Sequence, residues 1–165
     1  MLHRNWVAVM TGTSDTPVSR CRYYRTVCGL PAAVRDGTGR ISFTTNLVWA
    51  ISMPADVGHA VKLDLERRQR DGGPIISHPR SHTWTMLVRS DIPLREVPDI
   101  AQLRRFGVQV LRRGHEIVLP SPTDRGAQVR AWITAPCSTF RPSGMVVLES
   151  VRMALASRRG TPCPR

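Results

Sequence analysis

The stretch from residue 40 to residue 67, RISFTTNLVWAISMPADVGHAVKLDLER, decides the fold. In its first half, apolar residues recur at every second position, which is the period of a β-strand. These residues are Ile41, Phe43, Leu47, Trp49, Ile51 and Met53. We interpret this half as two strands that form a hairpin. Pro54 then opens a helix, because Val57, Val61 and Leu65 follow at helical spacing.

Segments on both sides of this stretch show the same two periods. Thr16-Pro17 predicts the start of a first helix that buries Val18, Cys21, Tyr24 and Cys28, and Gly29 and Pro31 predict its end. A third helix is expected with Asp99 as its N-cap and Gly107 after its end, and a closing helix from about residue 143 to 157. Further strands are expected at 74–77, 83–88, 108–111, 116–119 and 129–133, with a hairpin turn at Arg113-Gly114.

Pairs of strands that alternate with single helices are typical of the α+β class. We therefore expect one domain over residues 16–157, with a single mixed or mostly antiparallel sheet and three to four helices packed on it. Residues 1–15 and 158–165 are expected to be disordered tails. Met10 is an alternative start for the native chain, which would make residues 1–9 an extension.

The charge of the chain is strongly positive. Among 165 residues there are 24 basic and 12 acidic ones, giving a net charge of +12, and Lys62 is the one lysine among the basic residues. A GC-rich genome, such as that of an actinomycete, favours arginine codons, so part of this excess has a mutational explanation. Excess positive charge nevertheless attracts polyanions, and it points to DNA or RNA as a partner.

Sequence patterns of common active sites are missing. Cys21, Cys28, Cys137 and Cys163 form no CxxC pair, which argues against a zinc site and favours reduced, mostly buried thiols. There is no GxSxG elbow, P-loop or GxGxxG turn. No targeting or membrane-spanning segment is evident either, because the apolar run at 6–10 is short. We expect a soluble cytoplasmic protein with no catalytic residue, metal ion or cofactor.

Two polar loops are the candidate binding segments. The first, at 78–82, carries Arg80 and His82, and the second, at 120–126, carries Ser121 and Arg125, all suited to phosphate contacts. Arg130 lies on the strand that follows, and it shares a face with Trp132, a candidate for base stacking. Trp49 and Trp84 are expected in the core instead. Both loops are also compatible with ordinary solvated connections between strands.

The middle of the chain resembles the N-terminal domain of bifunctional DNA primase/polymerases (prim-pol), the archaeo-eukaryotic primase type. Residues 50–54, followed by a helix, are similar to a strand that ends in a D-x-D-P motif in that family. Residues 77–88 are similar to the family's His and following strand, and residues 119–132 to its proline-rich loop. The resemblance covers about residues 40–145, and the chain is also similar to short uncharacterised actinobacterial proteins. It implies a role in DNA replication.

The departures from the family pattern decide the expected activity. At the places of the metal-binding acids stand Ile51 and Met53, and apolar side chains cannot hold Mg²⁺ or Mn²⁺. The resemblance thus implies a catalytically inactive prim-pol-like domain that binds nucleic acid or a replication or transcription partner. One alternative is a regulatory protein-interaction module. Another is an active polymerase of the primase type with relocated acids, namely Asp56, Asp64 or Glu66.

Overall fold

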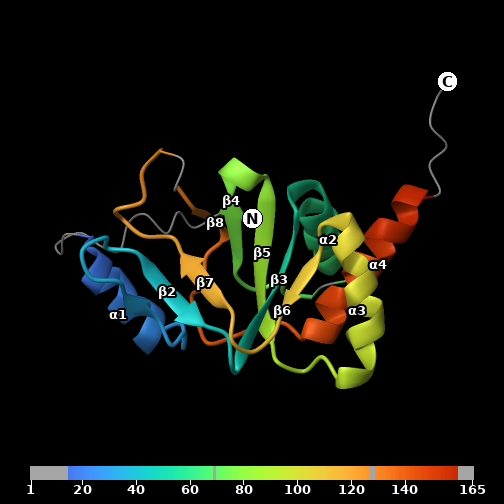
Figure 1. Ribbon diagram of the computed structural model, residues 1–165, viewed down its shortest axis with the longest axis horizontal. Helices are drawn as coiled ribbons and strands as arrows, with labels where there is room; N and C mark the ends of the chain where they lie inside the picture. Colours follow the sequence, from blue (N-terminus) through green and yellow to red (C-terminus); the bar gives the residue numbers. More distant parts are fainter. Residues whose placement is uncertain (1–14, 69, 127–128, 160–165) are drawn as a thin grey trace.

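The computed structural model describes residues 15–68, 70–126 and 129–159, and it confirms the α+β class (Figure 1). Within these ranges the chain forms four α-helices and two antiparallel sheets, of five and three strands. The prediction of a single sheet is therefore wrong. Residues 1–14 of the expected tail at 1–15, the alternative start at Met10, and residues 160–165 with Cys163 lie outside the described residues.

The larger sheet has the strand order β6-β3-β5-β4-β8. Its strands are β3 (Val48–Pro54), β4 (Ile75–His78), β5 (Thr83–Arg89), β6 (Gln109–Leu111) and β8 (Ala131–Thr134). Along the chain, α2 (Ala55–Arg67) lies between β3 and β4, and α3 (Val97–Leu103) lies between β5 and β6. The order β3-α2-β4-β5-α3-β6, with β5 between β3 and β4, is that of the split βαβ or ferredoxin-like motif. β8 extends this motif at the β4 edge.

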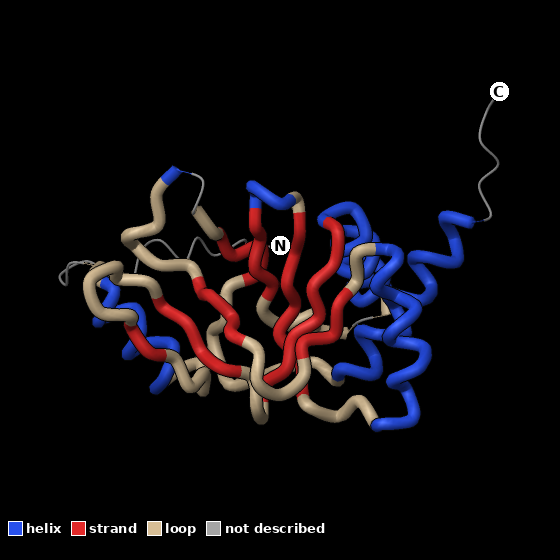
Figure 2. The backbone as a smooth tube through the Cα atoms, viewed as in Figure 1, coloured by secondary structure: helices blue, strands red, loops and turns tan. Residues whose placement is uncertain are grey.

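Helices cover one face of the five-stranded sheet (Figures 1 and 2). α2, α3 and the closing helix α4 (Gly144–Arg159) pack there on a core that includes Ile51, Met53 and Met86. The helical spacing of α2 and α4 predicted their buried sides correctly, because Val57, Val61, Leu65, Val147, Val151 and Leu155 are all buried. Trp49 and Trp84 pack against this core, as expected for core residues.

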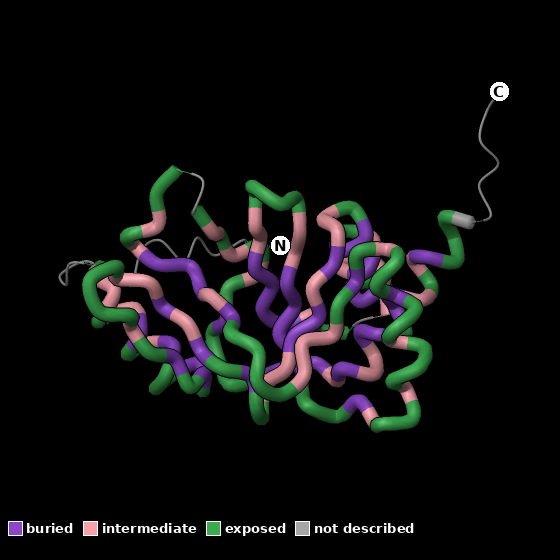
Figure 3. The backbone as a smooth tube through the Cα atoms, in the orientation of Figure 1, coloured by how far each residue is buried: buried purple, intermediate pink, exposed green. Residues whose placement is uncertain are grey.

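A second layer covers part of the other face. It consists of β1 (Ala33–Val34), β2 (Ile41–Thr44), β7 (Glu116–Leu119) and α1 (Pro17–Thr26). Their apolar side chains form a second core with Ala50, Ile76 and Leu87 of the larger sheet. Figure 3 shows buried backbone in purple both in the middle of the larger sheet and in this second layer.

A corner at Thr45 explains why there are two sheets. Thr45 is fully buried, and its backbone N–H donates to the His115 carbonyl while its own carbonyl accepts from the Gly114 N–H. Its hydroxyl accepts from the His115 N–H and contacts the Arg112 carbonyl. Both chain segments therefore turn here together, from β2 into β3 and from β6 into β7. The two predicted hairpins are wrong, because β2 pairs with β7 and β3 with β6.

Local signals fixed most element ends. Thr16 caps α1 with a capping box, and Gly107 follows the 3₁₀ turn η3 (Arg104–Phe106) in a left-handed conformation. Asp99 is not an N-cap, because α3 continues directly from the 3₁₀ turn η2 (Leu94–Glu96), with Glu96 at the capping position. Val18 is exposed instead of buried. α4 extends through Arg159, two residues into the expected tail.

Candidate functional site

Polar side chains replace the apolar pattern at one end of the five-stranded sheet, on the face away from the helices. Cross-strand pairing places Ser52 of β3 opposite Thr85 of β5, and Thr83 opposite His78 at the end of β4. Further along the same strands, this face carries Ala50 and Leu87 of the second core. The row of hydroxyl and imidazole groups thus begins where the second layer ends.

His78 is the centre of this polar row. Its Nε2 lies 2.9 Å from the Thr85 hydroxyl, and Thr85 itself is buried. Burial, together with the nearby positive charge of Arg130, lowers the pKa of His78 below its ordinary value. The imidazole is therefore neutral at pH 7 and able to exchange a hydrogen bond, while Arg130 supplies the positive charge beside it.

The loop at 120–126 is fastened to the turn at 36–39. The buried hydroxyl of Ser121 donates to the Gly39 carbonyl over 2.8 Å, and the Ser121 N–H donates to the Asp124 carboxylate. Gly39 has a φ of +67°, and a Cβ there would lie 2.8 Å from the Thr123 hydroxyl, so this close approach needs glycine. Ser121 is thus a structural residue of the loop, since its hydroxyl already bonds the neighbouring turn.

The other predicted contacts lie nearer the surface. Arg80 and His82 are exposed, in and just after the 3₁₀ turn η1 (Pro79–Ser81) that joins β4 to β5. Arg125 is exposed too, although its Nη1 donates to the carbonyls of Pro122 and Asp124 of its own loop. Figure 1 places both loops at the same end of the molecule. The structure thus brings Arg130 next to His78. Arg80 follows His78 by two positions in the sequence.

A buried tyrosine connects α1 to this end of the sheet. The Tyr24 hydroxyl donates to the Pro120 carbonyl over 2.8 Å and accepts from Trp132 Nε1 over 2.9 Å. The two rings meet edge to face, with their centroids 5.9 Å apart. Trp132, expected to stack on bases, is instead half-buried and packs on the second core. Its indole therefore joins α1 to β8.

The strand that resembles the D-x-D-P motif presents no metal ligands. Ile51 and Met53 are fully buried beneath the helices, on the opposite face from His78. On the face of His78, β3 carries Ser52 and Pro54 at this end of the sheet, and neither supplies a carboxylate. Within residues 15–68, 70–126 and 129–159, no three His, Cys, Asp or Glu side chains gather in a possible metal site.

The acids of α2 are engaged in ion pairs and hydrogen bonds on the helical side of the sheet. Asp56 pairs with Arg158 of α4, and this hydrogen bond lowers the pKa of its carboxyl group. The Ser150 hydroxyl donates to Asp64 over 2.6 Å and, with Arg68, likewise lowers the pKa of that carboxyl group. Glu66 pairs with Lys62 of the same helix. Asp56 and Asp64 therefore join α2 to α4, whereas Glu66 stays within α2.

Comparison with protein-family models, with curated protein sequences and with solved structures gives no significant match. The primase/polymerase resemblance thus stays a hypothesis from the sequence. In the described part of the chain, no helix has the length and apolar character needed to cross a bilayer. Cys21 and Cys28 are buried free thiols and Cys137 is an exposed one.

Charge is distributed unevenly between the two sides of the molecule. Most carboxylates lie in the segments that form the helical layer and its connections, where arginines pair with them. Residues 15–45 and 112–141, which contribute α1, the smaller sheet and the loop at 120–126, carry ten arginines against four acids. These acids are Asp15, Asp36, Glu116 and Asp124. The net charge of these segments is therefore +6, against +4 for residues 46–111 and 142–159, so both sides of the molecule are basic.

Sequence reasoning missed His78, Ser52 and Thr85. The signal was present, because Ser52 alternates with Ile51 and Met53, and Thr85 with Trp84 and Met86. This alternation predicts polar side chains on the face of the strands opposite the helix-covered core. The interpretation from sequence placed His78 in the loop at 78–82, whereas β4 continues through His78.

Proposed function

We propose that this protein is a catalytically inactive, primase/polymerase-like domain that binds nucleic acid in the cytoplasm. Arg80, Arg125 and Arg130 are the phosphate contacts, at the end of the sheet that carries His78. The observation that carries this proposal is the polar row itself. It combines a neutral imidazole, hydroxyl groups and the charge of Arg130 at one end of the sheet.

The sheet favours contacts to phosphates over contacts to bases. Domains of the split βαβ type that read single-stranded RNA stack bases on aromatic side chains of the open sheet face. Here the corresponding positions of the central strands carry Ser52 and Thr85, and the second core occupies the rest of that face. Binding through arginines alone depends on charge and is largely independent of sequence.

A salt titration with fluorescently labelled oligonucleotides tests this proposal. For single-stranded DNA, each arginine that contacts a phosphate contributes about −0.7 to the slope of log K against log salt concentration. The variant R80Q/R125Q/R130Q is therefore expected to bind more weakly, with a slope flatter by about 2. Glutamine keeps much of the side-chain length while removing the charge.

A charge-matched variant separates a local site from general attraction. R67Q/R70Q/R104Q also removes three exposed arginines, from the end of α2, the segment after it and η3. It is expected to keep most of the affinity and the slope. Absence of binding at low salt, or an equal loss in both triple variants, would contradict the proposed interface.

The lack of catalysis has its own test. We expect no metal-dependent primer synthesis from nucleoside triphosphates, because neither face of β3 offers a pair of carboxylates. Primer synthesis that is lost in D56N, D64N or E66Q would instead support the alternative with relocated acids. Those three substitutions remove helix ion pairs, so folding of each variant must be verified by circular dichroism.

A further inference from the structure

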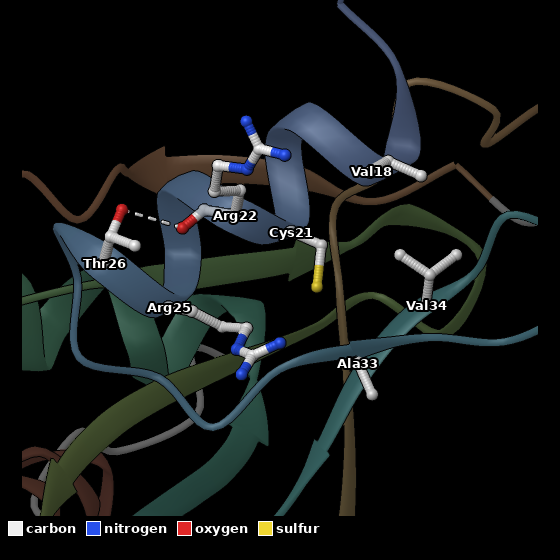
Figure 4. Close-up of a pocket in the computed structure, with 7 residues that line it drawn as sticks. All are labelled: Val18, Cys21, Arg22, Arg25, Thr26, Ala33 and Val34. Atoms are coloured by element: carbon white, nitrogen blue, oxygen red, sulfur yellow. Dashed lines mark hydrogen bonds between the residues drawn. The ribbon is translucent and has the colours of Figure 1, made fainter.

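A groove follows the free edge of the smaller sheet, away from the polar row. A hollow of about 410 Å³ lies between α1 and β1, with Val18, Cys21 and Val34 as its apolar wall (Figure 4). A second hollow, of about 510 Å³, shares Ala33 with the first and is lined by Pro31 on one side and Arg113 on another. The first hollow borders both residues of β1, and the second borders Ala33 and the residues before it.

β1 offers a template for an added strand. This two-residue strand pairs with β2 on one side, and among the described residues no strand pairs with its other side. The backbone N–H and C=O groups on the outer edge of a sheet can pair with an extended peptide. α1 runs beside this edge, so an incoming segment would lie between a helix and a strand.

The charges of the groove select an acidic occupant. The guanidinium groups of Arg22 and Arg25 have no hydrogen-bond or ion-pair partner among the described residues. Figure 4 shows the Arg25 side chain extending from α1 into the space beside Ala33. No Asp or Glu belongs to the lining of either hollow. Carboxylates are therefore the natural partners of these two arginines.

The apolar part of the wall favours a peptide over a nucleic acid strand. Val18 is 61% exposed, which is unusual for a residue at a position that the helical pattern assigns to the core. No exposed aromatic ring lines the groove to stack on a base, since Phe43 is buried. Apolar side chains of a peptide would cover Val18 and Val34 and so remove exposed apolar surface from water.

We propose that the groove between α1 and β1 binds an extended acidic segment of a partner protein. The segment adds a strand to the free edge of β1, sets apolar side chains against Val18 and Val34, and sets carboxylates against Arg22 and Arg25. This site is separate from the nucleic-acid interface proposed above, and either can fail without the other.

The test uses a fluorescein-labelled nonapeptide that alternates Glu and Val, with a Lys–Val peptide and oligothymidylate as competing probes. The Glu–Val peptide is expected to bind, and R22Q/R25Q to weaken that binding about tenfold, as for loss of a charge-assisted hydrogen bond. R67Q/R70Q, which removes two exposed arginines elsewhere, is expected to bind as the parent protein does. Backbone amide shifts in NMR spectra are expected for residues 31–34 and the outer side of α1.

Backbone methylation of the peptide tests strand addition itself. Alternate N–H groups of an extended peptide point to opposite edges of the strand, so two peptides, methylated at either the odd or the even nitrogens, block opposite edges. We expect one of these peptides to lose binding and the other to keep it. Equal effects of both methylations would overturn the added strand. The proposal as a whole is wrong if the Glu–Val peptide fails to bind at millimolar concentration, if the Lys–Val peptide binds equally well, or if oligothymidylate shifts the same amides.

Discussion

Replacing Tyr24 with phenylalanine tests the link between α1, the loop at 120–126 and β8. The substitution keeps the ring and its packing while removing one hydroxyl, so it creates almost no cavity. The hydroxyl's hydrogen bonds to the Pro120 carbonyl and from Trp132 Nε1 disappear, together with its interaction with Arg20. Tyr24 and Pro120 are both buried, whereas Trp132 is half-buried.

The expected loss follows from these burial differences. A buried carbonyl that loses its donor costs about 1–3 kcal/mol, and a net hydrogen bond to the half-buried indole contributes about 1 kcal/mol. We therefore expect Tyr24→Phe to lower the free energy of unfolding by about 2–4 kcal/mol. Urea unfolding measures this quantity, and an unchanged m-value would indicate that the folded state keeps its compactness.

Tyr23→Phe is the matched control. Its hydroxyl donates to the Pro136 carbonyl over 3.1 Å, but that tyrosine is half-buried and makes one such bond. We expect its loss to cost about 0.5–1 kcal/mol. If Tyr24→Phe destabilises the protein no more than Tyr23→Phe does, the hydrogen bonds of the Tyr24 hydroxyl do not stabilise the contacts of α1 with the loop at 120–126 and β8.

Two further predictions concern the helix-covered face and the polar row. Gly58→Ala places a Cβ 2.7 Å from the Trp84 ring. The resulting overpacking costs about 1–3 kcal/mol of stability, which outweighs the roughly 1 kcal/mol gained in helix propensity. Thermal unfolding measures the net effect, and a more stable variant would contradict this prediction. Because the pKa of His78 is lowered in the folded state, the unfolded chain binds more protons below pH 6.5, and stability falls as the pH drops through that value. His78→Gln should flatten that dependence between about pH 5 and 7, and an unchanged dependence in this variant would contradict the prediction.

The sequence predicted the elements better than their pairing. The period of two in residues 40–53 reports burial on one side of a strand, and the spacing of Val57, Val61 and Leu65 reports burial on one side of a helix. Both are local properties. Which strands pair depends on the corner at Thr45, where contacts to Arg112 and His115 join residues about seventy positions apart. No local pattern carries that information.

The candidate site was predicted in part for the same reason. Exposed positions such as Arg80 and Arg125 follow from polar loops between apolar segments, and the structure finds both exposed. Ser121 looked equally available in sequence, but its hydroxyl bonds a turn more than eighty residues away. The role of His78 depends on Thr85 and Arg130, which belong to two different strands or their ends. Such a site exists only after the sheet has formed.

The position of the second layer determines how this fold can bind a partner. A bare split βαβ sheet offers its whole open face, but here α1 and the smaller sheet cover part of it and leave the polar row at one end. Ion pairs neutralise some of the arginines on the helical face. Because Tyr24 faces the loop at 120–126 while Arg22 and Arg25 border the groove at β1, this one helix supports both proposed surfaces. A displacement of α1 is expected to weaken both, whereas substitutions of the arginines should affect one at a time.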